Sequence, residues 1–164
     1  MIRLARPPKD YREKGKLSAI QLNLSEEFNL STQDKLSVPP HLSVWVDCLT
    51  SARQAYAFLP SDSPRKLVLR LNVEKICTIV GRSSISESYP NLLKVIWVHI
   101  FQDINGNQIR DRRQGAIGHS GITGLDEQQV PHGLSKSEFR LIRKDLRAQL
   151  AELASKDCFM IAEE

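Results

Sequence analysis

Glycines recur at every third position in one short segment of the chain and surround a histidine. Gly115, Gly118, Gly121 and Gly124 account for half of the 8 glycines, and His119 lies among them. Glycine is used where the backbone takes a positive φ angle, or where a ligand or another backbone must come close. This segment is therefore the first place where the sequence predicts a binding or catalytic site.

Two conformations of the segment lead to two kinds of site. If residues 115–125 are extended, alternate side chains point to opposite faces, and the face with Gly118, Ser120 and Gly124 is almost bare. A bare face admits a helix or a ligand at close range, while His119 points from the opposite face. If the segment is a loop, its glycine N–H groups could point at an anion such as a phosphate.

His119 could act as a general acid or base, or hydrogen-bond a phosphate, because imidazole titrates near neutral pH. A second histidine, His99, ends a strongly apolar segment and could face His119 as its partner in acid–base cleavage of RNA. Arg112 and Arg113 precede the glycines and would supply positive charge. The other residues expected to bind the anion are Gly115, Gly118, Ser120 and Gly121. Alternatively, His119 hydrogen-bonds main-chain groups and has only a structural role.

Familiar motifs assign no reaction to this segment. A P-loop needs Gly-Lys-Ser/Thr at its end, and a dinucleotide-binding fingerprint needs a strand before and a helix after its glycines; neither is present. The nucleophile elbow Gly-x-Ser-x-Gly fails at Ile122, which disfavours Ser120 as a nucleophile. Residues 103–114 have Gln108 and Gln114 at the sixth and twelfth positions, where a calcium loop needs glycine and glutamate. No Cys or His pair has zinc spacing, so we expect no metal and no cofactor.

The net charge of +4 is concentrated at the start of the chain. Residues 1–16 hold six Lys or Arg and two acidic residues, so residues 17–164 carry equal numbers of each sign. A basic N-terminal arm is therefore predicted over residues 1–16, and it could dock nucleic acid without sequence preference. A solubilising tail is the alternative, because only Tyr11 is available for base stacking.

Length and composition favour one ordinary globular domain, expected over residues 17–164. No apolar run approaches the roughly 18 residues that a membrane-spanning helix needs. The 3 cysteines are an odd number and lie far apart, which argues against a disulfide framework and for buried thiols. We therefore expect a cytoplasmic protein that does not contact a membrane.

Alternating apolar residues predict several strands and a short helix. Extended segments are expected at residues 17–24, 41–47, 66–71, 92–100 and 158–162, and residues 73–80 are expected to form a short turn and a further extended piece. The segment 92–100 is apolar on both faces, which predicts a central strand. Asn105-Gly106 marks a two-residue hairpin turn. A short helix is expected from Thr50 or Ser51 to Leu59.

The last predicted element is a long amphipathic helix from Ser135 or Ser137 to about Ala154. Acidic side chains line one flank of its apolar stripe, and basic side chains line the other. The basic flank consists of Lys136, Arg140, Arg143, Lys144 and Arg147. Flanks of opposite sign suit packing against a neighbouring element or subunit better than binding to nucleic acid. A core helix with solvated charges is the alternative.

Together these elements predict a single α+β domain, with a mixed or antiparallel sheet and the C-terminal helix packed on it. The favoured function is a small intracellular, non-enzymatic interaction or accessory protein. It would contact an unidentified protein partner, or a second copy of itself, through the C-terminal helix or a sheet edge. The alternative is a small phosphate-handling enzyme, RNase-like or nucleotide-modifying, that uses His119 and His99. The enzyme requires both histidines to line one open pocket.

Overall fold

A six-stranded antiparallel sheet is the framework of the domain. The computed structural model describes residues 1–6, 21–57, 59, 63–84, 87–97, 101–102, 108–109 and 118–161. The strands of the sheet are β1 (Ile2–Ala5), β2 (Leu42–Trp45), β3 (Leu67–Arg70), β6 (Lys94–Trp97), β9 (His119–Thr123) and β10 (Cys158–Met160). Their order is β10-β3-β1-β2-β9-β6, and every neighbouring pair is antiparallel.

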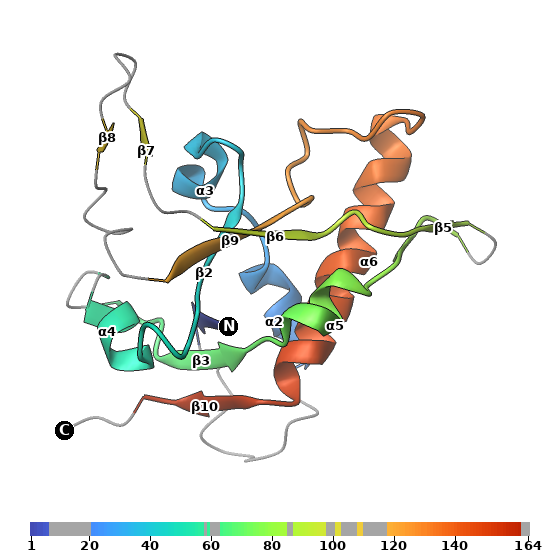
Figure 1. The fold of residues 1–164 in the computed structure, drawn as a ribbon. Coiled ribbons are helices and arrows are strands. Elements are labelled where there is room, and N and C mark those ends of the chain that lie inside the picture. Colours follow the sequence, from blue (N-terminus) through green and yellow to red (C-terminus); the bar gives the residue numbers. More distant parts are fainter. Residues whose placement is uncertain are drawn as a thin grey trace.

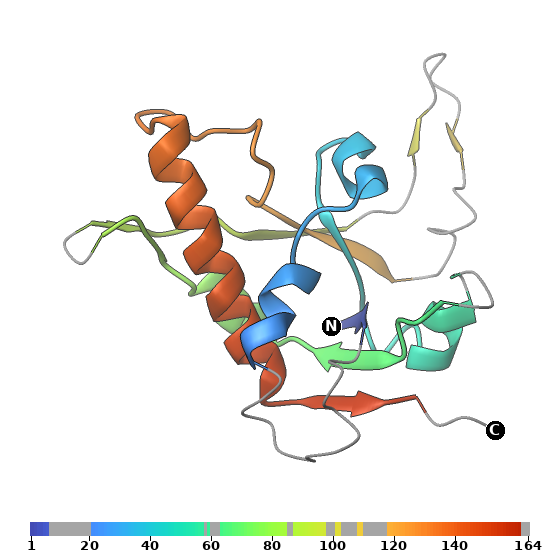
Figure 2. The ribbon, with the colours of Figure 1, turned by 180° about the vertical axis from the view of Figure 1, so that it is seen from behind.

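Helices pack on this sheet (Figure 1). The buried hydrophobic residues form two clusters. The helices are α2 (Gln21–Glu27), α3 (Thr32–Leu36), α4 (Ala52–Ala57), α5 (Val73–Cys77) and α6 (Lys136–Ser155). Figure 2 shows α2 lying beside α6. Leu67 and Leu69 of β3 join the cluster that contains residues of α2 and α6, whereas Val68 joins the cluster at α4. Successive side chains of a strand point to opposite faces, so the sheet is buried on both sides at β3.

The long C-terminal helix α6 follows the sequence prediction closely. It begins with a capping box in which Ser135 Oγ accepts from Glu138 N at 3.2 Å and Ser135 N donates to the Glu138 carboxylate at 2.8 Å. Its apolar stripe is buried against the sheet and consists of Phe139, Ile142, Leu146 and Leu150. The predicted α+β domain, with an antiparallel sheet and this helix packed on it, is therefore confirmed.

A buried polar link joins β1 to α2 and α3. Arg3 donates from Nε and Nη2 to the carbonyl oxygen of Glu27 at 3.0 and 2.8 Å, and from Nη1 to that of Ser43 at 2.8 Å. Burial lowers the pKa of Arg3 to about 10, so the guanidinium stays charged at neutral pH. Burial alone would raise the pKa of Asp34, but the charge of Arg3 and hydrogen bonds from Ser31 and Ser43 hold it below its ordinary value. The buried cation thus fixes α2 and α3 to the sheet.

Two segments that were predicted to be extended are helical. Residues 21–24 belong to α2, and residues 73–77 form α5. The side chain of Asn72 caps α5 by accepting a hydrogen bond from Lys75 N at 3.0 Å. Both predictions were wrong because a short apolar run fits a strand and a short helix equally well. Packing of α2 against α6 decided the first case.

The segment predicted as the central strand lies at the edge of the sheet. β6 pairs with β9, and no other strand in the described part of the chain pairs with it. An apolar pattern on both faces of a strand therefore does not show whether one or two strands pair with it. β1 occupies an interior position instead, although it falls within the arm expected over residues 1–16. Residues 7–16 of that arm lie outside the described residues.

The remaining strands form two small ribbons. β4 (Gly81–Arg82) pairs with β5 (Ser88–Tyr89), and β7 (Phe101–Gln102) pairs with β8 (Gln108–Ile109), both antiparallel. The second pair flanks the expected turn at Asn105-Gly106, which itself lies outside the described residues. Such a pairing is the one that a hairpin turn there requires.

Two further observations concern the described helices and the cysteines. None of the described helices is long and apolar enough to cross a membrane. All three thiols are free, but Cys48 and Cys77 are exposed and Cys158 is half-buried. The expectation of buried thiols was therefore wrong for Cys48 and Cys77, which lie at a turn and at the end of α5 rather than inside strands.

Candidate functional site

The glycine-rich segment is extended where the structure describes it, and it forms β9 between β2 and β6. Gly118 precedes the strand with a φ angle of 93°, and its carbonyl oxygen accepts a hydrogen bond from Val46 N at 2.9 Å. Gly115 lies outside the described residues. Of the two conformations that the sequence left open, the described residues therefore adopt the extended one.

Because Gly121 has no side chain, it leaves room for the ring of His41. A Cβ atom at this position would lie 2.7 Å from His41 Cβ and would collide with the imidazole ring of His41. The ring is fully buried, and its Nδ1 lies 2.7 Å from the carbonyl oxygen of Pro39. Gly124 has a φ angle of 93° and approaches the carbonyl group of Leu92. Both glycines thus serve close packing within the chain.

His119 is enclosed by aromatic rings, with only 1% of its surface exposed. Its ring centroid lies 5.8 Å from that of Trp45 and 5.9 Å from that of His41, and both pairs are tilted. Ser120 is also 1% exposed, and its hydroxyl points back to the carbonyl oxygen of Gly118 at 3.4 Å. Neither side chain is exposed to solvent in this arrangement.

The rest of the expected enzyme site lies outside the described residues. This applies to His99, Arg112, Arg113 and Gly115. The pairing of His99 with His119 and the phosphate contacts of the two arginines therefore stay predictions. No group of three or more Cys, His, Asp or Glu side chains in the described ranges could hold a metal ion.

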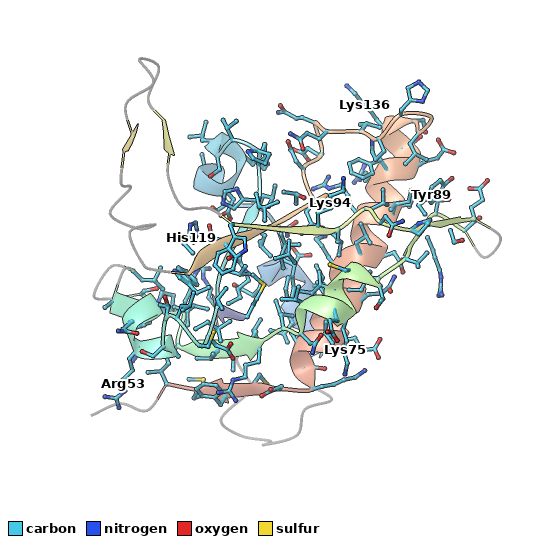
Figure 3. The ribbon with its side chains drawn as sticks, viewed as in Figure 1. Arg53, Lys75, Tyr89, Lys94, His119 and Lys136 are labelled. Atoms are coloured by element: carbon cyan, nitrogen blue, oxygen red, sulfur yellow. The ribbon has the colours of Figure 1, made fainter. Side chains whose placement is uncertain are left out.

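An open groove of about 740 Å³ lies along the basic flank of α6. The walls come from α6, from the segment just after α2, and from the loop after β9. They consist of Asn29, Glu127, Gln128, Lys136, Phe139, Arg140, Arg143 and Arg147. Four of these residues are cations of α6, and one is an acid. Figure 3 places Lys136 at the start of α6, away from His119.

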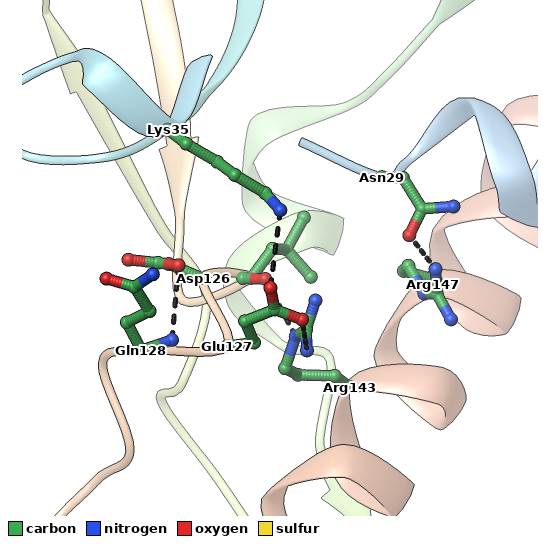
Figure 4. Close-up of polar contacts among 8 residues, drawn as sticks. Asn29, Lys35, Asp126, Glu127, Gln128, Arg143 and Arg147 are labelled. Carbon is green, nitrogen blue, oxygen red and sulfur yellow. Dashed lines mark hydrogen bonds and ion pairs between the residues drawn. The ribbon is translucent and has the colours of Figure 1, made fainter. Parts of the chain in front are cut away.

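Two of the groove arginines are anchored to the protein (Figure 4). Arg143 donates from Nε to the carbonyl oxygen of Leu125 at 2.8 Å, and its Nη1 lies 3.5 Å from Glu127. Arg147 donates from Nη1 to Asn29, while its Nε is buried and has no hydrogen-bond partner among the described residues. These contacts fix both guanidinium groups in the wall of the groove.

The other two groove cations, Lys136 and Arg140, are exposed and make no hydrogen bond or ion pair with the described part of the chain. Glu127, in the loop after β9, also lines the groove and is shared by Lys35 at 3.3 Å and Arg143 at 3.5 Å. The hydrogen bond from Lys35, followed by the charges of Lys35 and Arg143, lowers the pKa of Glu127. The groove therefore has unused positive charge on one wall and already binds one carboxylate of its own.

The sequence identified the basic flank of α6 but not the groove. The spacing of four, three and four residues between its cations places them on one side of the helix. Lys144, which the sequence grouped with them, does not line the groove. Asn29 and the loop residues Glu127 and Gln128 gave no signal in the sequence, because only folding brings three distant segments to one place.

Comparison with known proteins adds no assignment to this geometry. No protein-family model matches the chain, no curated protein matches it, and no solved structure matches it.

Proposed function

We propose that this protein is a non-enzymatic binding protein that contacts a partner protein through the basic side of α6. One observation carries the proposal: Lys136, Arg140, Arg143 and Arg147 line an open groove, and the first two make no ion pair with the described residues. Unpaired cations in a concave surface favour binding of an anionic partner. An anionic partner would form ion pairs with Lys136 and Arg140.

The two flanks of α6 support a protein partner over nucleic acid. The acidic flank is engaged within the chain, since Asp145 accepts from Arg82 N at 2.9 Å and from Gln149 at 2.7 Å. Glu138 is engaged in the capping box. The helix therefore offers one basic side instead of a basic surface all round, and its acidic flank would repel a wrapped polyanion.

Binding is also favoured over catalysis by the burial of His119. A general acid or base must come within hydrogen-bond reach of the proton that it transfers. An imidazole with 1% exposure does not meet that condition without movement of Trp45 or His41. We keep the phosphate-handling enzyme as the weaker proposal. Its test is RNA or nucleotide cleavage by the His119→Ala variant, which must be impaired if the proposal is correct.

The expected location is the cytoplasm. Free, exposed thiols at Cys48 and Cys77 suit a reducing compartment, where thiols persist without pairing. The same thiols would be open to oxidation outside the cell.

Affinity capture from the native host, with matched charge reversals on α6, tests the proposed function. Arg140→Glu reverses an exposed cation inside the groove, and Lys144→Glu reverses an exposed cation of the same helix outside it. We expect the wild type and Lys144→Glu to capture the same partner, and Arg140→Glu to lose most of it. Equal capture by both variants would contradict the assignment of α6 as the binding surface.

The sheet edge at β6 is a second candidate surface. Trp97 is 57% exposed there, and an exposed tryptophan on an edge strand is typical of a contact site. Trp97→Ser in the same capture experiment distinguishes the surfaces. Loss of the partner in Trp97→Ser, with Arg140→Glu unaffected, would move the interface from α6 to the sheet edge.

A further inference from the structure

We propose that the groove binds an acidic segment of polypeptide, whose carboxylates displace Glu127 from Arg143. This inference rests on the proposed function and names the chemistry of the partner. It follows from the carboxylate already present in the groove, the row of cations beside it, and the amides that complete the lining.

Glu127 occupies the position that a carboxylate of the partner would take. Its side chain lies 3.3 Å from Lys35 Nζ and 3.5 Å from Arg143 Nη1 (Figure 4). The Glu127 side chain is 55% exposed and the Lys35 side chain 45% exposed. Ion pairs between exposed side chains contribute little to stability, so the contact of Glu127 with Lys35 is readily exchanged, and an incoming carboxylate takes the place of Glu127 beside Arg143, whose side chain is 14% exposed. Glu127 thus acts as an internal competitor for the site.

The four cations form a row of suitable length for several acidic side chains. Lys136 and Arg147 are eleven residues apart, which corresponds to about 16 Å along an α-helix. Side chains on one face of an extended peptide repeat at about 7 Å, so three acidic residues at alternate positions would lie within this row. Arginine also matches the two oxygens of a carboxylate with a pair of parallel hydrogen bonds.

The neutral residues in the lining favour polypeptide over nucleic acid. The groove contains one aromatic residue, Phe139, which is 2% exposed and cannot stack on a base. Asn29 and Gln128 contribute amide groups, which can both donate to and accept from a peptide backbone. Nucleic acid would find phosphate contacts here but no stacking platform.

Fluorescence anisotropy with a labelled octaglutamate peptide tests the inference. We expect the wild type to bind octaglutamate more tightly than octaglutamine, and more tightly than an oligothymidylate of equal length. Arg140→Ala should weaken octaglutamate binding about fivefold or more, because charge-assisted hydrogen bonds are the strong ones. Lys144→Ala, with the same loss of charge outside the groove, should change it less than about twofold.

The Glu127→Gln variant tests the displacement mechanism through the direction in which the affinity for octaglutamate changes. The substitution removes the competing carboxylate and keeps the size of the side chain, so octaglutamate should bind more tightly, by about threefold. Unchanged or weaker binding would overturn the displacement mechanism. Tighter binding of oligothymidylate than of octaglutamate, or equal effects of Arg140→Ala and Lys144→Ala, would overturn the assignment of an acidic peptide to this groove.

The two proposals can fail separately. If Arg140→Glu loses the captured partner but octaglutamate does not bind in the groove, the partner is not recognised through an acidic segment. The proposed binding function is then still supported. If octaglutamate binds through Arg140 but capture does not depend on this residue, the groove binds carboxylates and the proposed function is wrong. Circular dichroism of each variant confirms that it is folded.

Discussion

The polar side chains inside the sheet and the cations along α6 are of similar chemical types but have opposite surroundings. Arg3 is buried, and its three hydrogen bonds all end on main-chain carbonyl groups. His119 is packed between rings. Arg140, by contrast, is exposed beside an open groove. A reactive residue type therefore marks a binding site only where the fold leaves its side chain accessible and without a partner.

The largest expected effect is on folding, from Arg3→Met. The substitution removes two hydrogen bonds to Glu27 at the end of α2 and one to Ser43 within β2, and it leaves Asp34 buried without its cation. We expect the free energy of unfolding to fall by about 3–5 kcal/mol in urea denaturation. Arg140→Met is the matched control and should change it by less than about 0.5 kcal/mol. Similar effects of the two substitutions would remove the distinction between the regions.

Gly121→Ala should destabilise the protein by about 1–3 kcal/mol, because the new Cβ would collide with the ring of His41. Urea denaturation of a double-mutant cycle with His41→Ala sharpens this prediction. The loss of unfolding free energy caused by Gly121→Ala should be smaller in the His41→Ala background, which lacks the ring. Fully additive costs would mean that Gly121 does not accommodate this ring.

Acid should destabilise the interior network through Asp34. The pKa of Asp34 in the folded protein is lowered from its ordinary 3.8, so its contribution to stability is fully present above that pH. The contribution is lost as the pH falls below 3.8 towards the folded-state pKa. Unfolding free energies measured between pH 6 and pH 2.5 should therefore decline less steeply for Asp34→Asn than for the wild type. Parallel declines would contradict the role of Asp34.

The smallest expected effect on stability is that of Arg140→Ala. Its side chain is exposed and makes no ion pair with the described residues, so the free energy of unfolding should change by less than about 0.5 kcal/mol. Thermal or urea unfolding checks this beside the binding measurements. A large loss of stability would show that the groove cations, like Arg3, are used by the fold.

The sequence predicted the fold better than it predicted the site. The segments 41–47, 66–71 and 158–162 contain β2, β3 and β10, and the helical repeat after Ser135 corresponds to α6. The short segments at 21–24 and 73–77 were assigned to the wrong element, because a few apolar residues do not separate period 2 from period 3.6. The glycines at three-residue spacing did indicate close packing, but the group that approaches Gly121 is the side chain of His41.

By itself, the sequence determined the amphipathic helix, several of the strands and the row of cations at four, three and four residues. These features follow from local periodicity, which folding does not alter. Only the tertiary structure decided that β1 lies inside the sheet, that His119 is enclosed, and that Asn29 and Glu127 meet the cations of α6. Burial and contacts between distant segments depend on where elements pack, and side-chain patterns within one segment do not encode that.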